Sequence, residues 1–588
     1  MSKIFENRIF RCGQSNYYLK DEILFVNQTH TDDNLKAIAD SGFNGIWLRL
    51  TLRDIVPTSL FQKYSLSSDK YLHELDKLCR RAGRFGLKVW PYLTEPLGME
   101  ASHPFWKANP DLAGHTTQIY NEEPQIALCS STQAVQDYLH TGFSTFFKKL
   151  PLAGAILITS SEHVSNCWAH VLSNPKAYPN PETFWARKCR CPRCSKHSPA
   201  EVISSIITLI HNSINSVNKN AKVVAWDWSW NMHFKPPYED ISKLLPKDVI
   251  FMGDFERGGK VKRLNKTNIV EEYSLIYHGP SPRFKSKAEY TVKQHRPLWA
   301  RFQINTTHEL ATISNLPMIV SLYRKFKFLH QSKASGFMGC WNFACCTNTL
   351  NTFAVKELCG SKFDNNEKRW LAGLAKKYFG SRIDADLVVK AWYGFDRASR
   401  HYPIGGNNNF LYFSPVNEAL SYPLVLDFKG IPMGGSWLKH KFSDRLEDTA
   451  LTYSLEEIAE SFGELAKVWS KALVVYEKAL NSESSNTRMR QEFGVAKIIG
   501  GIFQSTYNIY RWYLLRKDKK TNSITVIERD IVINELENIK TALPFVEADS
   551  RAGFHQEPQW QMFDSGSIRR KITLLSKYIE PEPTTSCL

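Results

Sequence analysis

Gly154-Ala-Ile-Leu-Ile-Thr-Ser-Ser-Glu162 is the stretch that decides the fold of this chain. Its apolar, β-branched part, 155–158, predicts a strand buried on both faces, as the strands of parallel sheets are. The stretch then changes abruptly to hydroxyl side chains and a carboxylate. In an α/β barrel the reactive groups lie at the carboxyl ends of the strands, where the βα loops converge. We therefore predict that Glu162 is a catalytic acid at the mouth of such a barrel; the alternative is an exposed glutamate that begins a loop.

Further strands are expected on both sides of this one, and helical stretches separate most of them. They are predicted over 46–50, 88–93, 126–129, 222–230, 248–256, 297–305 and 336–343. With 154–162 as the fourth, eight strands that alternate with helices indicate a (β/α)8 TIM barrel of the α/β class. An open doubly wound sheet shows the same alternation, but the count of eight and the polar or aromatic strand ends favour the barrel. No Gly-x-Gly-x-x-Gly or Walker-type loop marks a nucleotide site.

The predicted secondary structure changes near residue 360, where strand patterns give way to helical ones. Helices are predicted over 367–379, 385–399, 455–479, 488–515 and 525–543. We expect two domains: a barrel over 1–355, with a Cys-rich insertion near 163–198, and a mainly α-helical C-terminal domain over 356–588.

Composition narrows the class of protein. Of the 588 residues, 43% are apolar and 23% charged, which is ordinary for a soluble globular enzyme. Aromatic residues reach 13%, with 16 Trp, and aromatic faces suit a surface or cleft that binds sugars as well as a large helical core. The net charge of +17 suggests contact with a polyanion: nucleic acid, anionic lipid or an acidic glycan. Its densest run, Arg516-Lys-Asp-Lys-Lys520, is short and interrupted, so we expect a solvated face and no nucleic-acid partner.

The compartment is inferred from what the sequence lacks. The N-terminal residues contain no apolar signal-peptide core, and no run of 18 apolar residues exists. We therefore expect a cytoplasmic protein without a membrane partner, whose 12 Cys are mostly reduced.

Several motifs resemble those of one enzyme family. Ala127-Leu-Cys-Ser-Ser-Thr132, a helix and then Ile156-Leu-Ile-Thr-Ser-Ser-Glu162 look like the third and fourth strands of family 20 glycoside hydrolases, the β-N-acetylhexosaminidases. The resemblance is closer to an uncharacterised bacterial group that is itself similar to family 20, and it covers about residues 40–345. The marks of that group are Thr94-Glu-Pro96, Ser161-Glu162 followed by Asn166-Cys167, Cys191-Pro-Arg-Cys194, Ala225-Trp-Asp-Trp-Ser229, Glu272-Tyr-Ser274 and Gln303-Ile-Asn-Thr-Thr307.

The resemblance implies that Glu162 is the general acid/base. A carboxyl group near an apolar strand end can have a raised pKa, which suits proton donation to a glycosidic oxygen. Family 20 enzymes place an Asp before this Glu to orient the acetamido group of the substrate, but this chain has Ser161 there. Either another carboxylate replaces that Asp or the mechanism differs. The candidates for a second carboxylate are Asp227, Glu256, Glu95 and Glu309, the first two as catalytic groups.

A further set is expected to bind the substrate. Arg49 ends the first predicted strand, where family 20 enzymes use an arginine to bind sugar hydroxyls, although a structural ion pair is the alternative. Trp341 is a candidate platform under the sugar ring, with core packing as its alternative. Trp226 and Trp228 lie on one face of their strand and Asp227 on the other, and only one face looks into the barrel. The predicted substrate-binding residues are Arg49, Glu95, Trp228, Tyr273, Gln303 and Trp341.

The cysteines of the insertion have the spacing of metal ligands. A Cys-x-x-Cys turn, here Cys191–Cys194, lets two thiolates reach one Zn²⁺. The proposed set adds Cys167, with Cys189 or His197 as the fourth ligand. Such a site is structural, because four protein ligands leave no open position for catalysis. Free or redox-active cysteines are the alternative, and no cofactor is expected for catalysis.

Three functions remain open at this point. The first is an exo-acting glycosidase for β-linked N-acetylhexosamine with Glu162 as acid/base. The second is a glycosidase for a sugar without an acetamido group that uses two protein carboxylates, which Ser161 encourages. The third is a non-catalytic carbohydrate- or polyanion-binding barrel, because Cys340-Trp-Asn-Phe-Ala-Cys-Cys346 stands where the related group has a Gly/Pro-rich run.

Overall fold

The centre of the protein is a closed barrel of parallel strands. The computed structural model describes residues 5–15, 22–117, 123–160, 163–173, 186–343, 345–404, 414–433, 442–450, 452–482 and 485–579. The barrel strands are β1 (Asn7–Phe10), β2 (Gly45–Arg49), β3 (Lys88–Leu93), β7 (Gly154–Ile158), β8 (Lys222–Trp226), β9 (Ile250–Asp254), β12 (Leu298–Arg301) and β13 (Gly336–Met338). Strand β1 closes the ring, because Ile9 pairs with Gly45 on one side and with Met338 on the other. The predicted (β/α)8 barrel is therefore confirmed.

Two of the strand assignments change. The first barrel strand is β1, a four-residue strand that the sequence analysis missed. The prediction of a third barrel strand at 126–129 is wrong: β6 (Gln125–Leu128) pairs antiparallel with β4 (Met99–Glu100) and β5 (Ala113–Thr117) in a separate small sheet. A short apolar run has the same pattern in either sheet, so the pattern alone did not separate them. The count of eight survives because one error offset the other.

Indole rings fill the interior of the barrel. Trp47, Trp90, Trp226 and Trp299 point inward from four different strands and are almost completely buried. Trp90 and Trp299 meet edge to face, with ring centroids 5.1 Å apart. A Cβ at Gly154 would lie 2.6 Å from the Trp90 ring and closer still to the backbone oxygen of Lys222. The neighbouring strand and the Trp90 ring together therefore account for the glycine at the start of the deciding strand.

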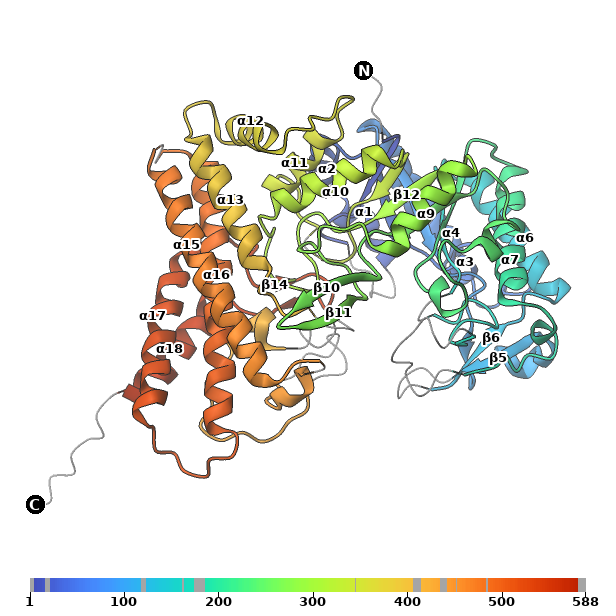
Figure 1. The fold of residues 1–588 in the computed structure, drawn as a ribbon. Helices are drawn as coiled ribbons and strands as arrows, with labels where there is room; N and C mark the ends of the chain where they lie inside the picture. Colours follow the sequence, from blue (N-terminus) through green and yellow to red (C-terminus); the bar gives the residue numbers. More distant parts are fainter. Residues whose placement is uncertain are drawn as a thin grey trace, which may run out of the picture.

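Helices cover the outside of the barrel. The longer ones are α2 (Asp32–Asp40), α4 (Ser68–Arg84), α6 (Gln133–Lys149), α7 (Pro199–Asn215), α9 (Pro282–Lys293), α10 (Ile319–Gln331) and α11 (Leu350–Leu358). Single turns form α1 (Val26–Thr29), α3 (Leu52–Ile55), α5 (Phe105–Ala108) and α8 (Glu239–Ser242). A hairpin of β10 (Gly259–Arg263) and β11 (Lys266–Val270) follows β9. Helices α6 and α7 and the small sheet lie at one end of the molecule (Figure 1).

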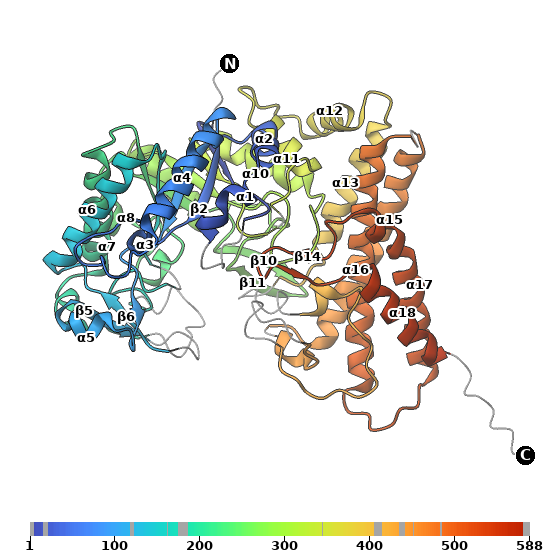
Figure 2. The same ribbon diagram turned by 180° about the vertical axis from the view of Figure 1, so that it is seen from behind.

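Long helices form the opposite end (Figures 1 and 2). They are α12 (Glu367–Phe379), α13 (Ala385–Ser399), α15 (Leu455–Ser482), α16 (Thr487–Arg516), α17 (Val526–Ala548) and α18 (Ser565–Ile579). Trp469 of α15 ties this layer together: its indole stacks on Phe395 of α13 at 4.3 Å and donates a hydrogen bond to Ala496 O of α16. Among the described helices, none combines the length and the apolar character that crossing a bilayer needs.

A short hairpin between α17 and α18 returns to the barrel. Its strands are β14 (Phe554–His555) and β15 (Trp560–Gln561). Gly553 N donates to Thr312 O at 2.7 Å, and Cys345 N donates to the side chain of Gln556 at 2.9 Å. Because Thr312 and Cys345 follow β12 and β13, this hairpin lies at the carboxyl end of the barrel.

Candidate active site at the carboxyl end of the barrel

Aromatic rings pack against one another at the carboxyl end of the barrel, and all but the half-buried Trp228 are buried. Trp47 stacks on Trp341 with ring centroids 4.9 Å apart and an interplanar angle of 16°. Trp226 packs edge-on against Trp341 and Trp228, and Trp228 lies 5.4 Å from Tyr273. We call these five residues the aromatic wall. The structure thus brings together three of the predicted substrate-binding residues, Trp228, Tyr273 and Trp341.

Asp254 is the carboxylate that this wall holds. It is the last residue of β9, and its side chain points into the barrel because it lies two residues after the inward-facing Met252. It is only 5% exposed. Trp226 Nε1 donates to Oδ1 at 3.1 Å, and Arg257 Nη1 lies 3.5 Å from Oδ2. Burial raises the pKa of the Asp254 carboxyl, and the charges of Arg257 and Arg301 oppose that rise. The site therefore contains a carboxyl group that can hold a proton more readily than an exposed one.

Arg301 lies beside this carboxylate at the end of β12. Its guanidinium stacks 3.9 Å above the Tyr273 ring and is completely buried. None of its three nitrogens has a hydrogen-bond partner among the described residues. Gln303 repeats the feature two residues later, because its Oε1 accepts from Trp341 N at 2.8 Å while its Nε2 is left without a described partner. Buried donors without partners are costly, so these groups point to a polar ligand.

Glu162 and Ser161 lie outside the described residues. The residues that flank them are held at the same end of the barrel. Ser160 Oγ is 3.2 Å from His233 Nε2, and His163 Nε2 is 3.4 Å from Arg49 Nη2. Burial, together with the charge of Arg49, lowers the pKa of His163 well below its usual value. Arg49 thus ends β2 at the barrel mouth, as predicted.

The structure does not bring Asp227 and Glu256 into the aromatic wall. Because Trp226 faces inward, Asp227 faces outward, where it forms a buried ion pair with Lys287 of α9. Glu256 lies two residues beyond the end of β9 and forms a buried ion pair with Lys325 of α10. Each carboxylate is therefore bound to an ammonium group of the outer helical layer.

Glu95 and Glu309 are also bound elsewhere. Glu95 Oε1 accepts from Leu52 N at 2.7 Å, and its Oε2 accepts from Leu97 N and Tyr138 Oη. These bonds fasten the end of β3 to α3 and α6, so we read Glu95 as a structural residue.

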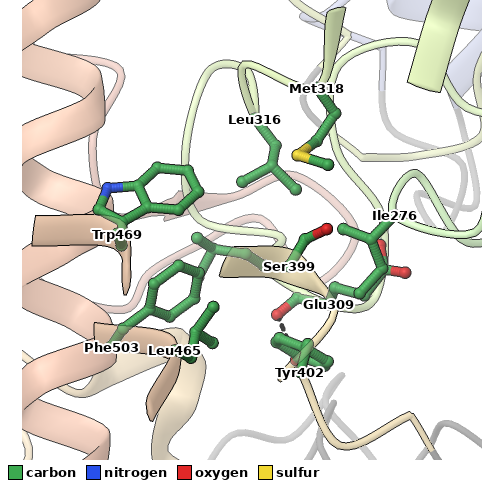
Figure 3. Close-up of a pocket in the computed structure, with 10 residues that line it drawn as sticks. Ile276, Glu309, Leu316, Met318, Ser399, Tyr402, Leu465, Trp469 and Phe503 are labelled. Carbon is green, nitrogen blue, oxygen red and sulfur yellow. Dashed lines mark hydrogen bonds between the residues drawn. The ribbon is translucent and has the colours of Figure 1, made fainter. Parts of the chain in front are cut away.

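Glu309 borders an apolar pocket between the barrel loops and the C-terminal helices (Figure 3). Its carboxylate accepts from Ser274 Oγ, Thr307 Oγ1 and Leu275 N. Burial raises the pKa of Glu309 to about 7 despite these bonds.

Sequence reasoning missed four residues of this end of the barrel. Asp254 and Arg301 carried a usable signal, because they are charged residues at inward positions of otherwise apolar strands. Arg257 lies in a loop and carried no such signal. Glu557 carried none: its Oε1 accepts from Trp341 Nε1 at 3.2 Å across 216 positions of the chain. The buried Arg257 guanidinium stacks 3.7 Å above the Trp228 ring and so links the aromatic wall to Asp254.

The predicted metal cluster is completed by a different cysteine. The thiols of Cys129, Cys167, Cys191 and Cys194 lie within 4.8 Å of one another. Cys189 is buried but outside this group, and His197 is exposed. Cys129, which directly follows β6, takes the place predicted for them because the small sheet folds back onto the insertion.

Comparison with known proteins leaves the family open. No protein-family model and no curated protein matches the chain. Among solved structures, a chitobiase from Flavobacterium johnsoniae is similar at 12% identity and a TM-score of 0.37, over 97% of this chain and 78% of that one. A β-N-acetylhexosaminidase from Bacteroides fragilis is similar at 12% identity and a TM-score of 0.35, over 64% of this chain and 70% of that one. The exo-β-1,4-mannosidase Op5Man5 from Opitutaceae bacterium strain TAV5 is similar at 13% identity and a TM-score of 0.32, over 57% of this chain and 51% of that one. The present chain thus spans about half of the length of that mannosidase. Likenesses this distant carry no argument about activity.

Proposed function

We propose that this protein is a glycoside hydrolase whose site is the aromatic wall with Asp254 and Arg301. The observation that supports this most is a buried carboxylate set among five aromatic rings beside a guanidinium that has no hydrogen-bond partner in the described part of the chain. Aromatic faces cover the apolar faces of sugar rings. The donors of Arg301 and Gln303, which bond to none of the described residues, suit sugar hydroxyl or carbonyl oxygens.

The proposal gives the two carboxylates different tasks. Glu162 is the general acid/base, as the family 20 resemblance implies, and protonates the leaving glycosidic oxygen. Asp254 takes the part first expected of Asp227 or Glu256, because those two are bound to lysines while Asp254 lies in the wall. Its negative charge would stabilise the positive charge that develops on the sugar in the transition state.

The substrate class that we propose is β-linked N-acetylhexosamine, removed from a chain end. In this version the acetamido carbonyl of the substrate attacks the anomeric carbon, and Asp254 compensates for Ser161 by stabilising the acetamido nitrogen. In the alternative version the sugar has no acetamido group, and Asp254 acts directly as nucleophile or base.

A panel of chromogenic glycosides with and without a 2-acetamido group tests the proposal. We expect release of the chromophore from β-N-acetylhexosaminides and of single sugar units from short oligosaccharides. Hydrolysis confined to sugars without the acetamido group would support the alternative version. Measurable sugar binding without any hydrolysis would reject the hydrolase.

The variant Glu162→Gln tests the acid. General acid catalysis contributes roughly 10²–10⁴-fold, so kcat should fall by that factor while the thermal midpoint stays close to that of the parent. Glu201→Gln is the matched control, because Glu201 is an exposed capping residue of α7 and should leave kcat unchanged. Equal kcat values for the two variants would reject the role of Glu162.

A further inference from the structure

Four buried thiols meet between three separate segments of the chain. Cys129 follows β6, Cys167 lies in the loop after β7, and Cys191 and Cys194 lie in the turn before α7. Cys129 Sγ is 3.5 Å from Cys191 Sγ and 3.6 Å from Cys194 Sγ. All four sulfurs lie within 4.8 Å of one another. We call them the thiol cluster.

We propose that the thiol cluster binds one Zn²⁺ with four thiolate ligands. A Zn–S bond of about 2.3 Å places the sulfurs of a tetrahedral site about 3.8 Å apart, close to the spacing seen here. A disulfide needs its sulfurs at about 2.05 Å, and none of the described cysteines forms one. A four-iron cluster joins each thiolate to a different iron and so holds the sulfurs further apart.

The surroundings of the cluster suit thiolates better than neutral thiols. Arg193 Nε donates to Cys129 Sγ at 3.1 Å, and Cys194 N donates to Cys191 Sγ at 3.5 Å. Ser131 Oγ lies 3.3 Å from Cys194 Sγ. Four thiolates around one Zn²⁺ carry a net charge of −2, and a guanidinium and N–H donors stabilise that charge. Binding displaces one proton from each thiol and involves no change of oxidation state.

The proposed zinc would fasten the insertion to the barrel end. Cys167 follows Asn166, whose Nδ2 donates to Thr159 O directly after β7. Gly114 of β5 packs so closely on the cluster that a Cβ there would lie 2.4 Å from Cys167 Sγ. The ion would thus join the small sheet, the loop after β7 and the start of α7 through one point. Its role is structural, because all four coordination positions are filled by protein.

The test measures metal in the full-length protein, purified without chelators or metal-affinity resin. We expect one equivalent of zinc by mass spectrometry and four thiols that become reactive to alkylation only after a chelator is added. Protein stripped of zinc and loaded with Co²⁺ should show the absorption of a tetrahedral tetrathiolate site. Well below one equivalent of zinc in the native protein, or iron in its place, would overturn the proposal, and so would a disulfide between any two of the four.

Two single variants test which cysteines bind the zinc. Cys129→Ser should lower the zinc content and the thermal midpoint, because it removes one ligand. Cys189→Ser is the matched control, since Cys189 is a buried cysteine of the same insertion that lies outside the cluster, and it should keep the full equivalent. Loss of zinc in Cys189→Ser with retention in Cys129→Ser would contradict the ligand set. If Cys129→Ser does not fold, the metal content and thiol count of the parent protein still decide the question.

Discussion

Asp254 and Asp227 end neighbouring strands, yet their carboxylates lie on opposite sides of the barrel wall. Both are about 5% exposed, so burial does not distinguish them. Asp254 accepts a hydrogen bond from an indole inside the barrel, whereas Asp227 pairs with an ammonium group of α9 outside it. The alternation of side chains along a strand therefore places a candidate catalytic group inside the barrel and a structural one outside it, even though both residues are Asp.

This difference predicts that only one of the two amide variants loses activity directly. Asp254→Asn should lower kcat by roughly 10²-fold or more, because it removes charge from the transition state. It should also lower the thermal midpoint, because the buried Arg257 and Arg301 lose the negative charge beside them. Asp227→Asn should cost about 3–5 kcal/mol of unfolding free energy, because it leaves Lys287 buried without a counter-ion. Glycosidase assays and thermal denaturation of both variants provide the check. Loss of activity in Asp227→Asn at an unchanged thermal midpoint would show that the wrong carboxylate has been assigned.

At the scale of elements, strands that contain an apolar run were predictable from the sequence, and a strand without such a run was not. Strands β7, β8, β9 and β12 each combine β-branched or aromatic residues with a polar end, and all were predicted. Strand β1 has the sequence Asn7-Arg-Ile-Phe10, in which two of the four residues are polar, so no apolar run marks it. Strand β6 was assigned to the wrong sheet, because its sequence does not show whether its partner runs parallel or antiparallel. The cluster was predicted through its Cys-x-x-Cys turn, but Cys129 was missed because only the small sheet brings it there.

The contact between β5 and the thiol cluster predicts that adding one methyl group at Gly114 destabilises the protein. In Gly114→Ala the new Cβ would lie 2.4 Å from Cys167 Sγ and 2.9 Å from Ala127 O, so the sulfur or the strand must move. We expect a lower thermal midpoint and a lower zinc content. Gly83→Ala in α4 is the control, because no atom lies within 4 Å of its new Cβ.

The control variant should be neutral or more stable by about 0.5–1 kcal/mol, since alanine is the better helix former. Thermal denaturation and metal analysis of both proteins measure the difference. Equal midpoints for the two variants would show that β5 does not pack on the cluster as described.

At the scale of the whole molecule, the barrel and the C-terminal helices meet around Glu309. Its backbone carbonyl accepts from Tyr402 Oη at 2.6 Å, and its side chain borders the apolar pocket formed with Trp469 and Phe503 (Figure 3). No local sequence pattern predicts such a contact, because its partners lie about 90 to 200 positions further along the chain. The helices themselves were predictable from the sequence, but the contacts through which they pack on the barrel were not.

The raised pKa of Glu309 predicts how stability changes with pH. Its folded-state pKa of about 7 exceeds the usual 4.5, so between these values the folded state binds more protons than the unfolded state. The contribution of Glu309 to stability is therefore largest below about 4.5 and falls as the pH rises through 7, by up to about 3 kcal/mol. Glu309→Gln should remove this part of the pH dependence and be more stable than the parent above pH 7. Denaturant unfolding across this range measures it, and identical pH profiles for both proteins would contradict the assignment.

The hairpin of β14 and β15 makes the rim of the barrel depend on the order of synthesis. A ribosome releases β1 to β13 long before it adds Gln556 and Glu557, which contact Cys345 and Trp341 at that rim. A nascent chain that has already closed its ring of strands thus still presents an unfinished entrance, with the indole of Trp341 lacking its acceptor. The entrance of the barrel is therefore completed only after α17 and the hairpin that follows it have been synthesised.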